Sequence, residues 1–297
     1  MRARKPDVLE VTGTATDNSH VDQLWLEVVF DFLGTTVRLV SANIEHLQHW
    51  CAVYSEFRVS QREADITVRI SDRASKMTPR GVTIETPDSV TLWDGRSPLL
   101  PPLRAPGLNR YIYLQGAATG RDGHAVLMVG GRRSGRTTLA SASAARGARL
   151  LADDLVPIDP EDLLAMPWPK ALALPAPVLT ELGVHPSMPG LVPFVTRGGE
   201  LRWRVAPSAL FGRQLTRVPT DVAAIVFLES DDDDAAGLRD IAAGEAFERL
   251  VRHLETRPED RELTADALVR LCRRVPALAL RLSNPTDDAA LLDALTR

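Results

Sequence analysis

Apolar and polar residues alternate along the first third of the chain, a pattern typical of strands that bury one face. The alternation predicts strands at residues 24–29, 36–40, 64–71, 81–86 and 89–95. Gly34 falls between the first two and is expected to be a turn. Leu47, Trp50 and Cys51 recur at helical spacing and predict a helix over 44–54. This third is therefore expected to be a mostly β module with one helix.

Proline then interrupts the pattern at residues 97–107. Proline lacks an amide donor, so this stretch is neither a helix interior nor a central strand. We place a boundary there, between a β-rich module of residues 1–107 and a larger domain of residues 108–297.

Strands and helices alternate in the larger domain, which predicts an α/β fold there and α+β overall. Strands are expected at 110–118, 124–129, 148–154, 221–229 and 277–283, and helices at 137–145, 247–254, 268–272 and 287–297. The apolar run 221–229 fits a strand buried on both faces. Proline-rich residues 166–177 and 184–193 are expected to be extended loops, of a length that often forms a functional lid or a substrate-binding segment.

Composition and charge narrow the function classes. The formal net charge of -4 argues against a general nucleic-acid binder, which needs a basic face. No apolar run reaches the length of a membrane helix, and the basic N-terminus lacks the apolar stretch of a secretory signal. We expect a cytoplasmic protein with no membrane partner. Cys51 and Cys272 are expected to be unpaired thiols.

The strongest chemical signal is the segment VLMVGGRRSGRTTLA, residues 126–140. It reads as a strand, a glycine-rich loop and a helix, the context of a Walker A phosphate loop. Gly130, Gly135 and Thr137 fit that motif, with Arg136 in place of its lysine. The backbone amides and the helix N-terminus would face phosphate. The nucleotide-binding residues are then Gly130, Gly131, Arg132, Arg133, Ser134, Gly135, Arg136, Thr137 and Thr138.

Arg136 leaves two interpretations open. Arginine keeps the positive charge and donates two parallel hydrogen bonds to a phosphate. It is also longer and planar, so it does not fill the space of an ammonium. The site is therefore either a working nucleotide site or a degenerate one that binds without turnover.

An acidic pair ends the strand that follows the glycine-rich loop and its helix. Gly147 is expected to end the helix, and the strand after it ends in Asp153 and Asp154. In a parallel βαβ unit both loops would lie at the carboxyl end of the sheet. One carboxylate can hold Mg²⁺ while the other accepts a proton from an attacking hydroxyl.

The segment VLMVGGRRSGRTTLASASAARGARLLADDLVPID resembles the kinase domain of the HPr kinase/phosphorylase family, and more closely the smaller HPr-kinase-related proteins. That core is similar to the nucleotide-binding core of phosphoenolpyruvate carboxykinase. The resemblance implies ATP and Mg²⁺ as cofactors, with Arg136 catalytic. It implies Thr137 and Asp154 at Mg²⁺, and Asp153 as the base for a serine hydroxyl. Gln115 falls where the family often has histidine and is a candidate phosphate contact.

The resemblance implies an ATP-dependent kinase of a serine hydroxyl on a peptide or small protein, such as a precursor of a modified peptide. Two alternatives stay open: a degenerate nucleotide-binding regulatory or scaffold protein, and a kinase of a small metabolite. The sequence does not choose between ATP and GTP, and it is compatible with a homo-oligomer.

Other polar residues are assigned structural roles. Glu229, at the end of the buried run, either activates water or lies at the surface, and we favour the surface. Asp231 to Asp234 lack the spacing of a calcium loop and are expected to form a solvated turn. His124, His185 and His253 show no metal-binding spacing.

Overall fold

The computed structural model describes most of the chain in two compact units, Met1–Leu108 and Asn109–Arg297. The described residues are 25–60, 63–71, 82–86, 89–92, 101–131, 133–196, 198–212, 214–229, 237–256 and 261–296. The boundary expected from the prolines lies one residue before this division. Arg132 and the aspartates 231–234 lie outside the described residues.

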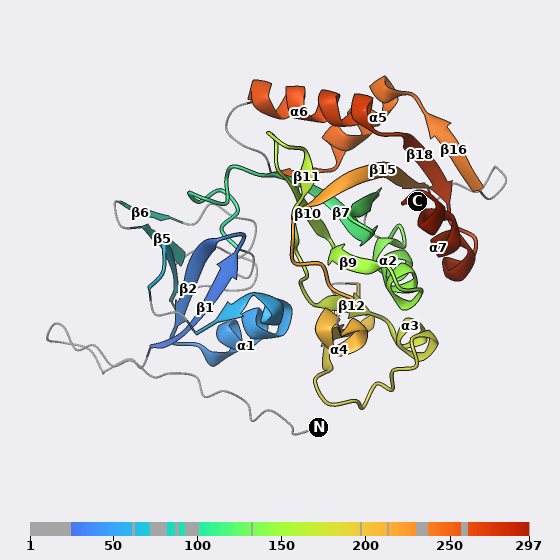
Figure 1. Ribbon diagram of the computed structural model, residues 1–297. Coiled ribbons are helices and arrows are strands. Elements are labelled where there is room, and N and C mark those ends of the chain that lie inside the picture. The colour runs from blue at the N-terminus through green and yellow to red at the C-terminus, as the bar shows by residue number, and fades with distance from the viewer. Residues whose placement is uncertain are drawn as a thin grey trace, which may run out of the picture. The chain divides into compact units, whose positions relative to one another are not determined.

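The smaller unit is a six-stranded sheet with one helix (Figure 1). Its strand order is β3-β1-β2-β4-β5-β6, antiparallel except between β2 and β4. The strands are β1 (Leu26–Phe32), β2 (Thr35–Ser41), β3 (Arg58–Val59), β4 (Ile66–Ile70), β5 (Val82–Thr86) and β6 (Ser89–Leu92). The helix is α1 (Ile44–Val53), followed by the short η1 (Ser55–Phe57). The predicted strands and helix are confirmed over these ranges, and residues 93–95 lie outside them.

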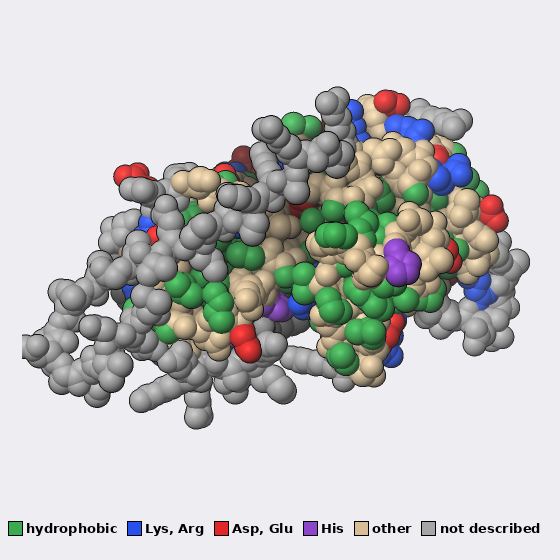
Figure 2. Space-filling view, turned by 90° about the horizontal axis from the view of Figure 1, so that it is seen from below, with side chains coloured by type: hydrophobic (Ala, Val, Ile, Leu, Met, Phe, Trp, Pro, Cys, Tyr) green, Lys and Arg blue, Asp and Glu red, His purple; other side chains and the backbone are tan. Residues whose placement is uncertain are grey.

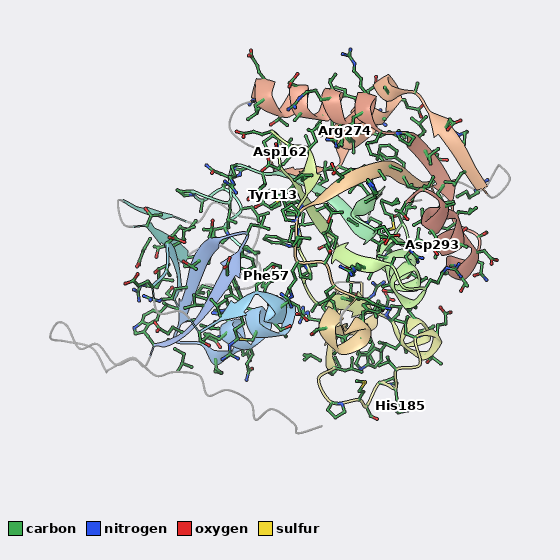
Figure 3. The ribbon with its side chains drawn as sticks, viewed as in Figure 1. Phe57, Tyr113, Asp162, His185, Arg274 and Asp293 are labelled. Carbon is green, nitrogen blue, oxygen red and sulfur yellow. The ribbon has the colours of Figure 1, made fainter. Side chains whose placement is uncertain are left out.

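Aromatic side chains form the core of the smaller unit. Phe30 and Phe32 project from β1 toward Trp50 of α1, with ring centroids 5.5 and 6.3 Å away. Tyr54 and Phe57 close the cluster, and Phe57 is labelled in Figure 3. All five are buried. The apolar face of the sheet and the apolar face of α1, both predicted from the sequence pattern, therefore pack together in one layer.

The larger unit is built on a nine-stranded sheet whose main path is β11-β10-β7-β8-β15-β18-β16. Two further strands, β9 and β17, pair with β7. The strands are β7 (Ile112–Arg121), β8 (His124–Val129), β9 (Arg149–Ala152), β10 (Leu155–Ile158), β11 (Leu164–Ala165), β15 (Thr220–Glu229), β16 (Gly237–Ile241), β17 (Leu254–Thr256) and β18 (Ala277–Arg281). The helices are α2 (Arg136–Ala145), α5 (Ala243–Arg252), α6 (Arg261–Arg274) and α7 (Pro285–Ala294).

Helices cover both faces of this sheet. Figure 1 shows α5 and α6 on one side of β15 and β18, with α2 and α7 on the other. Val226 and Leu228 pack with Leu139 of α2 and Leu292 of α7. The alternate residue, Phe227, faces the guanidinium of Arg249 on α5. The expectation that 221–229 is a strand buried on both faces is confirmed.

Helix α7 contacts α2 through ion pairs as well as through apolar packing. Asp293 accepts from Arg121 and from Arg146 at the end of α2, each at 3.3 Å (Figure 3). Gly147 follows with a φ of +97°, so the expected left-handed end of the helix is confirmed.

The expected parallel βαβ unit is wrong in its strand pairing. Strands β8 and β9 are not neighbours, because both pair antiparallel with β7 and lie on opposite sides of it. They still run in the same direction, so their carboxyl ends lie at the same edge of the sheet. The βαβ pattern predicts that β8 and β9 pair directly. Because β7 and β8 form a hairpin whose hydrogen bonds are local in sequence, β7 lies between β8 and β9 instead.

The proline-rich segments contain more regular structure than the expected loops. They contribute to a three-stranded sheet of order β12-β14-β13 with two short helices. Its elements are β12 (Leu172–Leu174), α3 (Ala176–Glu181), β13 (Val192–Val195), β14 (Leu201–Val205) and α4 (Pro207–Phe211). Proline is tolerated here because both helices carry it at or next to the first turn and Pro193 lies on an edge strand.

Candidate active site

The glycine-rich loop folds back on itself at the end of β8. The Ser134 amide donates to the Gly131 carbonyl at 3.3 Å. A Cβ on Gly130 would lie 2.6 Å from the Ser134 hydroxyl oxygen, so a side chain there would force the serine to move. Arg133 has a φ of +67°, which strains a residue with a side chain. Tight turns of this kind collect backbone amides around an anion.

Helix α2 begins directly after the loop. Its N-cap, Gly135, has a φ of +86°, and a Cβ there would collide with Leu282. No side chain in the described part of the chain caps this helix, and its first turn carries no acidic residue. The first amides, including those of Thr137 and Thr138, therefore face the space beside the loop with the positive end of the helix dipole. This arrangement suits a phosphate group.

Asp153 follows β9 and is almost completely buried beneath the start of α2. The Thr137 hydroxyl donates to Asp153 Oδ1 at 2.9 Å and approaches Oδ2 at 3.2 Å. Burial raises the pKa of Asp153 to about 6, and the neighbouring charge of Asp154 adds to the rise. Lys170, the Thr137 hydrogen bond and Arg136 oppose it. A buried carboxylate that is only partly compensated is suited to a cation.

Asp154 differs from its neighbour in exposure and contacts. Its φ of +69° turns the chain between β9 and β10, and 55% of its side chain is exposed. Lys170 Nζ lies 2.5 Å from Oδ2, and Arg136 Nη2 lies 3.9 Å from Oδ1. Asp154 therefore lies between two cations and is exposed to solvent. The sequence identified Arg136 as a site residue but missed Lys170.

Arg136 is the least exposed cation of the site. Only 9% of its side chain is exposed. Among the described residues, its Nη1 atom is buried with no hydrogen-bond partner. A buried donor without an acceptor is costly unless a ligand completes it. The guanidinium therefore has unused capacity for an anion in this structure.

Gln115 lies at the same sheet edge, because it pairs with Leu155, the residue after Asp154. Its side-chain amide donates to Glu255 Oε2 at 2.6 Å, and its backbone amide donates to the His253 carbonyl at 2.8 Å. Sequence analysis missed Glu255, which β17 brings next to β7 across 140 residues. Burial lowers the pKa of His253, and the charges of Arg136 and Arg252 lower it further.

Glu229 ends β15 near the loop, since β15 runs parallel to β8 and Phe227 pairs with Val129. Its carboxylate accepts from Arg249 at 2.8 Å and from Arg239 at 3.3 Å. These two arginines neutralise it and hold it in place. Glu229 is 32% exposed, and its two ion pairs were not predicted from the sequence.

The turn between β13 and β14 reaches the glycine-rich loop. A Cβ on Gly198 would lie 2.7 Å from Arg133 Nη2, so the guanidinium packs on the glycine backbone. Val195 and Leu201, on either side of the turn, are 66% and 50% exposed. Figure 2, which views the molecule from the side of α3 and α4, shows hydrophobic side chains gathered on the face turned to the viewer. The loop therefore lies beside a partly apolar surface.

The Thr137 hydroxyl and the carboxylates fit Mg²⁺, which prefers hard oxygen ligands and keeps several waters and substrate phosphates. Within the described residues no group of three His, Cys, Asp or Glu side chains could hold a metal by itself. A site of one hydroxyl and one or two carboxylates, completed by phosphate oxygens, is the ordinary form for a nucleotide-bound Mg²⁺.

Comparisons with known proteins leave this chain without a matching family. No family model matches it, and no curated protein matches it. Among solved structures it is similar to the HPr(Ser) kinase/phosphatase from Coxiella burnetii, with 14% identity and a TM-score of 0.32. That match covers 62% of this chain and 88% of the other. Across the described residues, no helix has the length and apolarity needed to cross a membrane.

Proposed function

We propose that this protein is an ATP- and Mg²⁺-dependent kinase that transfers the γ-phosphate to a serine hydroxyl of a peptide or small protein. One observation carries the proposal: the glycine-rich loop, the Thr137–Asp153 pair and Asp154 meet at one edge of the sheet. Phosphoryl transfer needs an anion cradle, metal ligands and an acceptor for the hydroxyl proton close together. These residues supply all three.

The loop and α2 bind and orient the phosphates. The first amides of α2, including those of Thr137 and Thr138, would bind the β- and γ-phosphates, and Arg136 would donate its unused Nη1 hydrogens to a phosphate oxygen. Thr137 and Asp153 would hold Mg²⁺, which would neutralise negative charge at the transferred group. Asp153 is assigned to the metal because Thr137 bonds to it and it is too buried to meet a peptide hydroxyl.

Asp154 is the proposed proton acceptor, the reverse of the assignment that the resemblance implies. Its exposed carboxylate is open to an incoming serine, whereas Asp153 is 2% exposed. The serine oxygen forms a bond to the γ-phosphorus as the bond from that phosphorus to the bridging oxygen breaks. The hydroxyl proton moves to Asp154, and ADP leaves. The exposure of Asp154 and of the β13–β14 surface supports a macromolecular acceptor over a small metabolite.

Nucleotide binding without turnover is the second candidate. It is favoured by the burial of Arg136, which replaces a flexible lysine with a side chain held inside the unit. A regulatory protein of this kind would bind Mg-ATP and would leave it intact. The two candidates differ in transfer, not in binding.

Calorimetry with Mg-ATP tests the proposal first. We expect wild type to bind, Arg136→Ala to lose at least about tenfold in affinity, and Arg136→Lys to retain binding. Arg146→Ala is the matched control, since it lies on the same helix and pairs with Asp293. A library of serine peptides with labelled ATP then tests transfer, which Asp154→Asn should reduce at least about 100-fold while still binding.

The outcomes separate the candidates. Absence of binding by folded wild type would overturn both. Binding without transfer to any peptide, with ATP left intact, would favour the regulatory candidate. Transfer by wild type and not by Asp154→Asn would support the kinase.

A further inference from the structure

Lys170 is held at the acidic pair by backbone hydrogen bonds along the edge of β9 and β10. The Met166 amide donates to the Pro157 carbonyl and the Trp168 amide to the Leu151 carbonyl, both at 2.8 Å. Trp168 is fully buried, with its ring edge-on to Tyr113 at 5.8 Å. The segment before Lys170 is therefore fixed, and its side chain is placed by the fold.

The ammonium of Lys170 contacts Asp154 at 2.5 Å while 18% of the lysine side chain is exposed. Asp154 itself is more than half exposed, and ion pairs on exposed carboxylates add little to stability. Arg136 approaches the other oxygen of the same carboxylate. Lys170 and Arg136 balance the two carboxylates of Asp153 and Asp154, so Mg²⁺ bound at Asp153 would leave an excess of positive charge beside Asp154. Such an excess is suited to an anion.

The chain also uses lysine very rarely. Its 35 basic residues include only three lysines, Lys5, Lys76 and Lys170. Lys170 is thus the one lysine of the larger unit, Asn109–Arg297. Where only charge matters this chain has arginine, so a lysine at this position indicates a need for a compact ammonium with three donors.

We infer that Lys170 supplies the ammonium at the terminal phosphate that the Arg136 loop lacks. The inference rests on the proposed function and adds a residue to it. One donor of Lys170 stays on Asp154, and the others bind oxygens of the γ-phosphate. The lysine then aligns the proton acceptor with the transferred group and neutralises charge that grows during transfer. Arg136, buried deeper, is left to the inner phosphates.

An acylating nucleotide tests this placement without an acceptor. The probe is ATP with an acyl group on its terminal phosphate. A lysine next to that phosphate attacks the acyl carbon and forms an amide. The bond from acyl carbon to phosphate oxygen breaks, ATP leaves, and the amine proton passes to solvent. Mass spectrometry then locates the acylated lysine.

We expect acylation of Lys170 at least about tenfold above Lys5 and Lys76, which serve as internal controls, and suppression by excess Mg-ATP. Labelling that Mg-ATP does not suppress, or that is equal on all three lysines, would overturn the inference. If calorimetry shows no Mg-ATP binding by folded wild type, the proposed function fails and this inference fails with it. Binding without labelling of Lys170 overturns this inference alone.

Calorimetry on Lys170→Met and Lys170→Arg distinguishes phosphate binding from a structural role. Loss of a contact to the terminal phosphate should weaken Mg-ATP at least about tenfold and Mg-ADP by less than about threefold. Lys170→Arg should recover part of the ATP affinity, because charge returns without the ammonium geometry. Equal weakening of ATP and ADP, in variants whose urea unfolding matches wild type, would contradict the inference.

Discussion

Each of the two units contains a threonine hydrogen-bonded to an aspartate. The pKa values of the two aspartates are shifted in opposite directions. In the smaller unit, Thr36 donates to Asp65 Oδ2 from its amide at 2.8 Å and its hydroxyl at 2.7 Å. These bonds lower the pKa of Asp65. In the larger unit, Thr137 donates to Asp153 at 2.9 Å, yet the pKa of Asp153 is raised to about 6.

Solvation and neighbouring charge explain the difference. Asp65 is exposed and accepts from the backbone, so its charged form is favoured. Asp153 is 2% exposed and is next to the like charge of Asp154. The same residue pair is therefore a structural clamp in one unit and a destabilised carboxylate in the other. Carboxylates with a pKa raised by burial and a neighbouring charge cluster at functional sites, and Asp153 lies beside the glycine-rich loop.

Of the substitutions that test this comparison, Asp153→Asn is expected to change the free energy of unfolding most. The raised pKa of Asp153 means that the folded state binds the proton more tightly than the unfolded state does. Its ionisation therefore removes stability as pH rises from about 4 to 6, and the loss persists above that. Asp153→Asn should raise the free energy of unfolding of the ligand-free protein by about 1–3 kcal/mol at pH 8. Urea unfolding of both proteins measures it.

The pH dependence is the control for that result. The gain from Asp153→Asn should shrink toward zero or reverse at pH 4, where the wild-type carboxyl is protonated. A variant less stable than wild type at pH 8 would show that Asp153 is a structural clamp like Asp65.

A smaller effect of opposite sign is expected in the first unit. Thr36→Val removes a hydroxyl that both donates to Asp65 and accepts from the Asp65 amide at 3.0 Å. Thr36 is buried and valine has the same shape, so the loss reports the hydrogen bonds. We expect a decrease of about 1–2 kcal/mol in the free energy of unfolding at pH 7. Unchanged stability would show that the hydrogen bonds between Thr36 and Asp65 do not stabilise the smaller unit.

The smallest effect is the pH dependence at Asp65. Because its folded pKa is lowered, its contribution is present above the unfolded pKa and disappears as pH falls through the folded one. Asp65→Asn should decrease the free energy of unfolding at pH 7 by about 1 kcal/mol or less, since the carboxylate is exposed to solvent. The difference from wild type should vanish at about pH 2. A difference that grows in acid would contradict the assignment.

Particular residues show how much of the structure could be predicted from the sequence. The loop from Gly130 to Thr138 was placed between a strand and a helix, and that arrangement is confirmed. The Asp pair was expected at the carboxyl edge of the sheet, and it lies there. Periodicity and turn residues encode such features because their hydrogen bonds close within a few residues. Strands β16 and β17 were missed, since each is short and pairs with a strand distant in sequence.

The sequence by itself determined the local chemistry: a glycine-rich turn before a helix, two adjacent carboxylates and an arginine in the lysine position. Tertiary structure decided which carboxylate meets Thr137, which one meets solvent, and that Lys170 and Glu255 join the site. The physical reason is that adjacent residues of a kinked strand point in different directions. Burial and charge are then set by elements 16 to 140 residues away, whose approach no local pattern encodes.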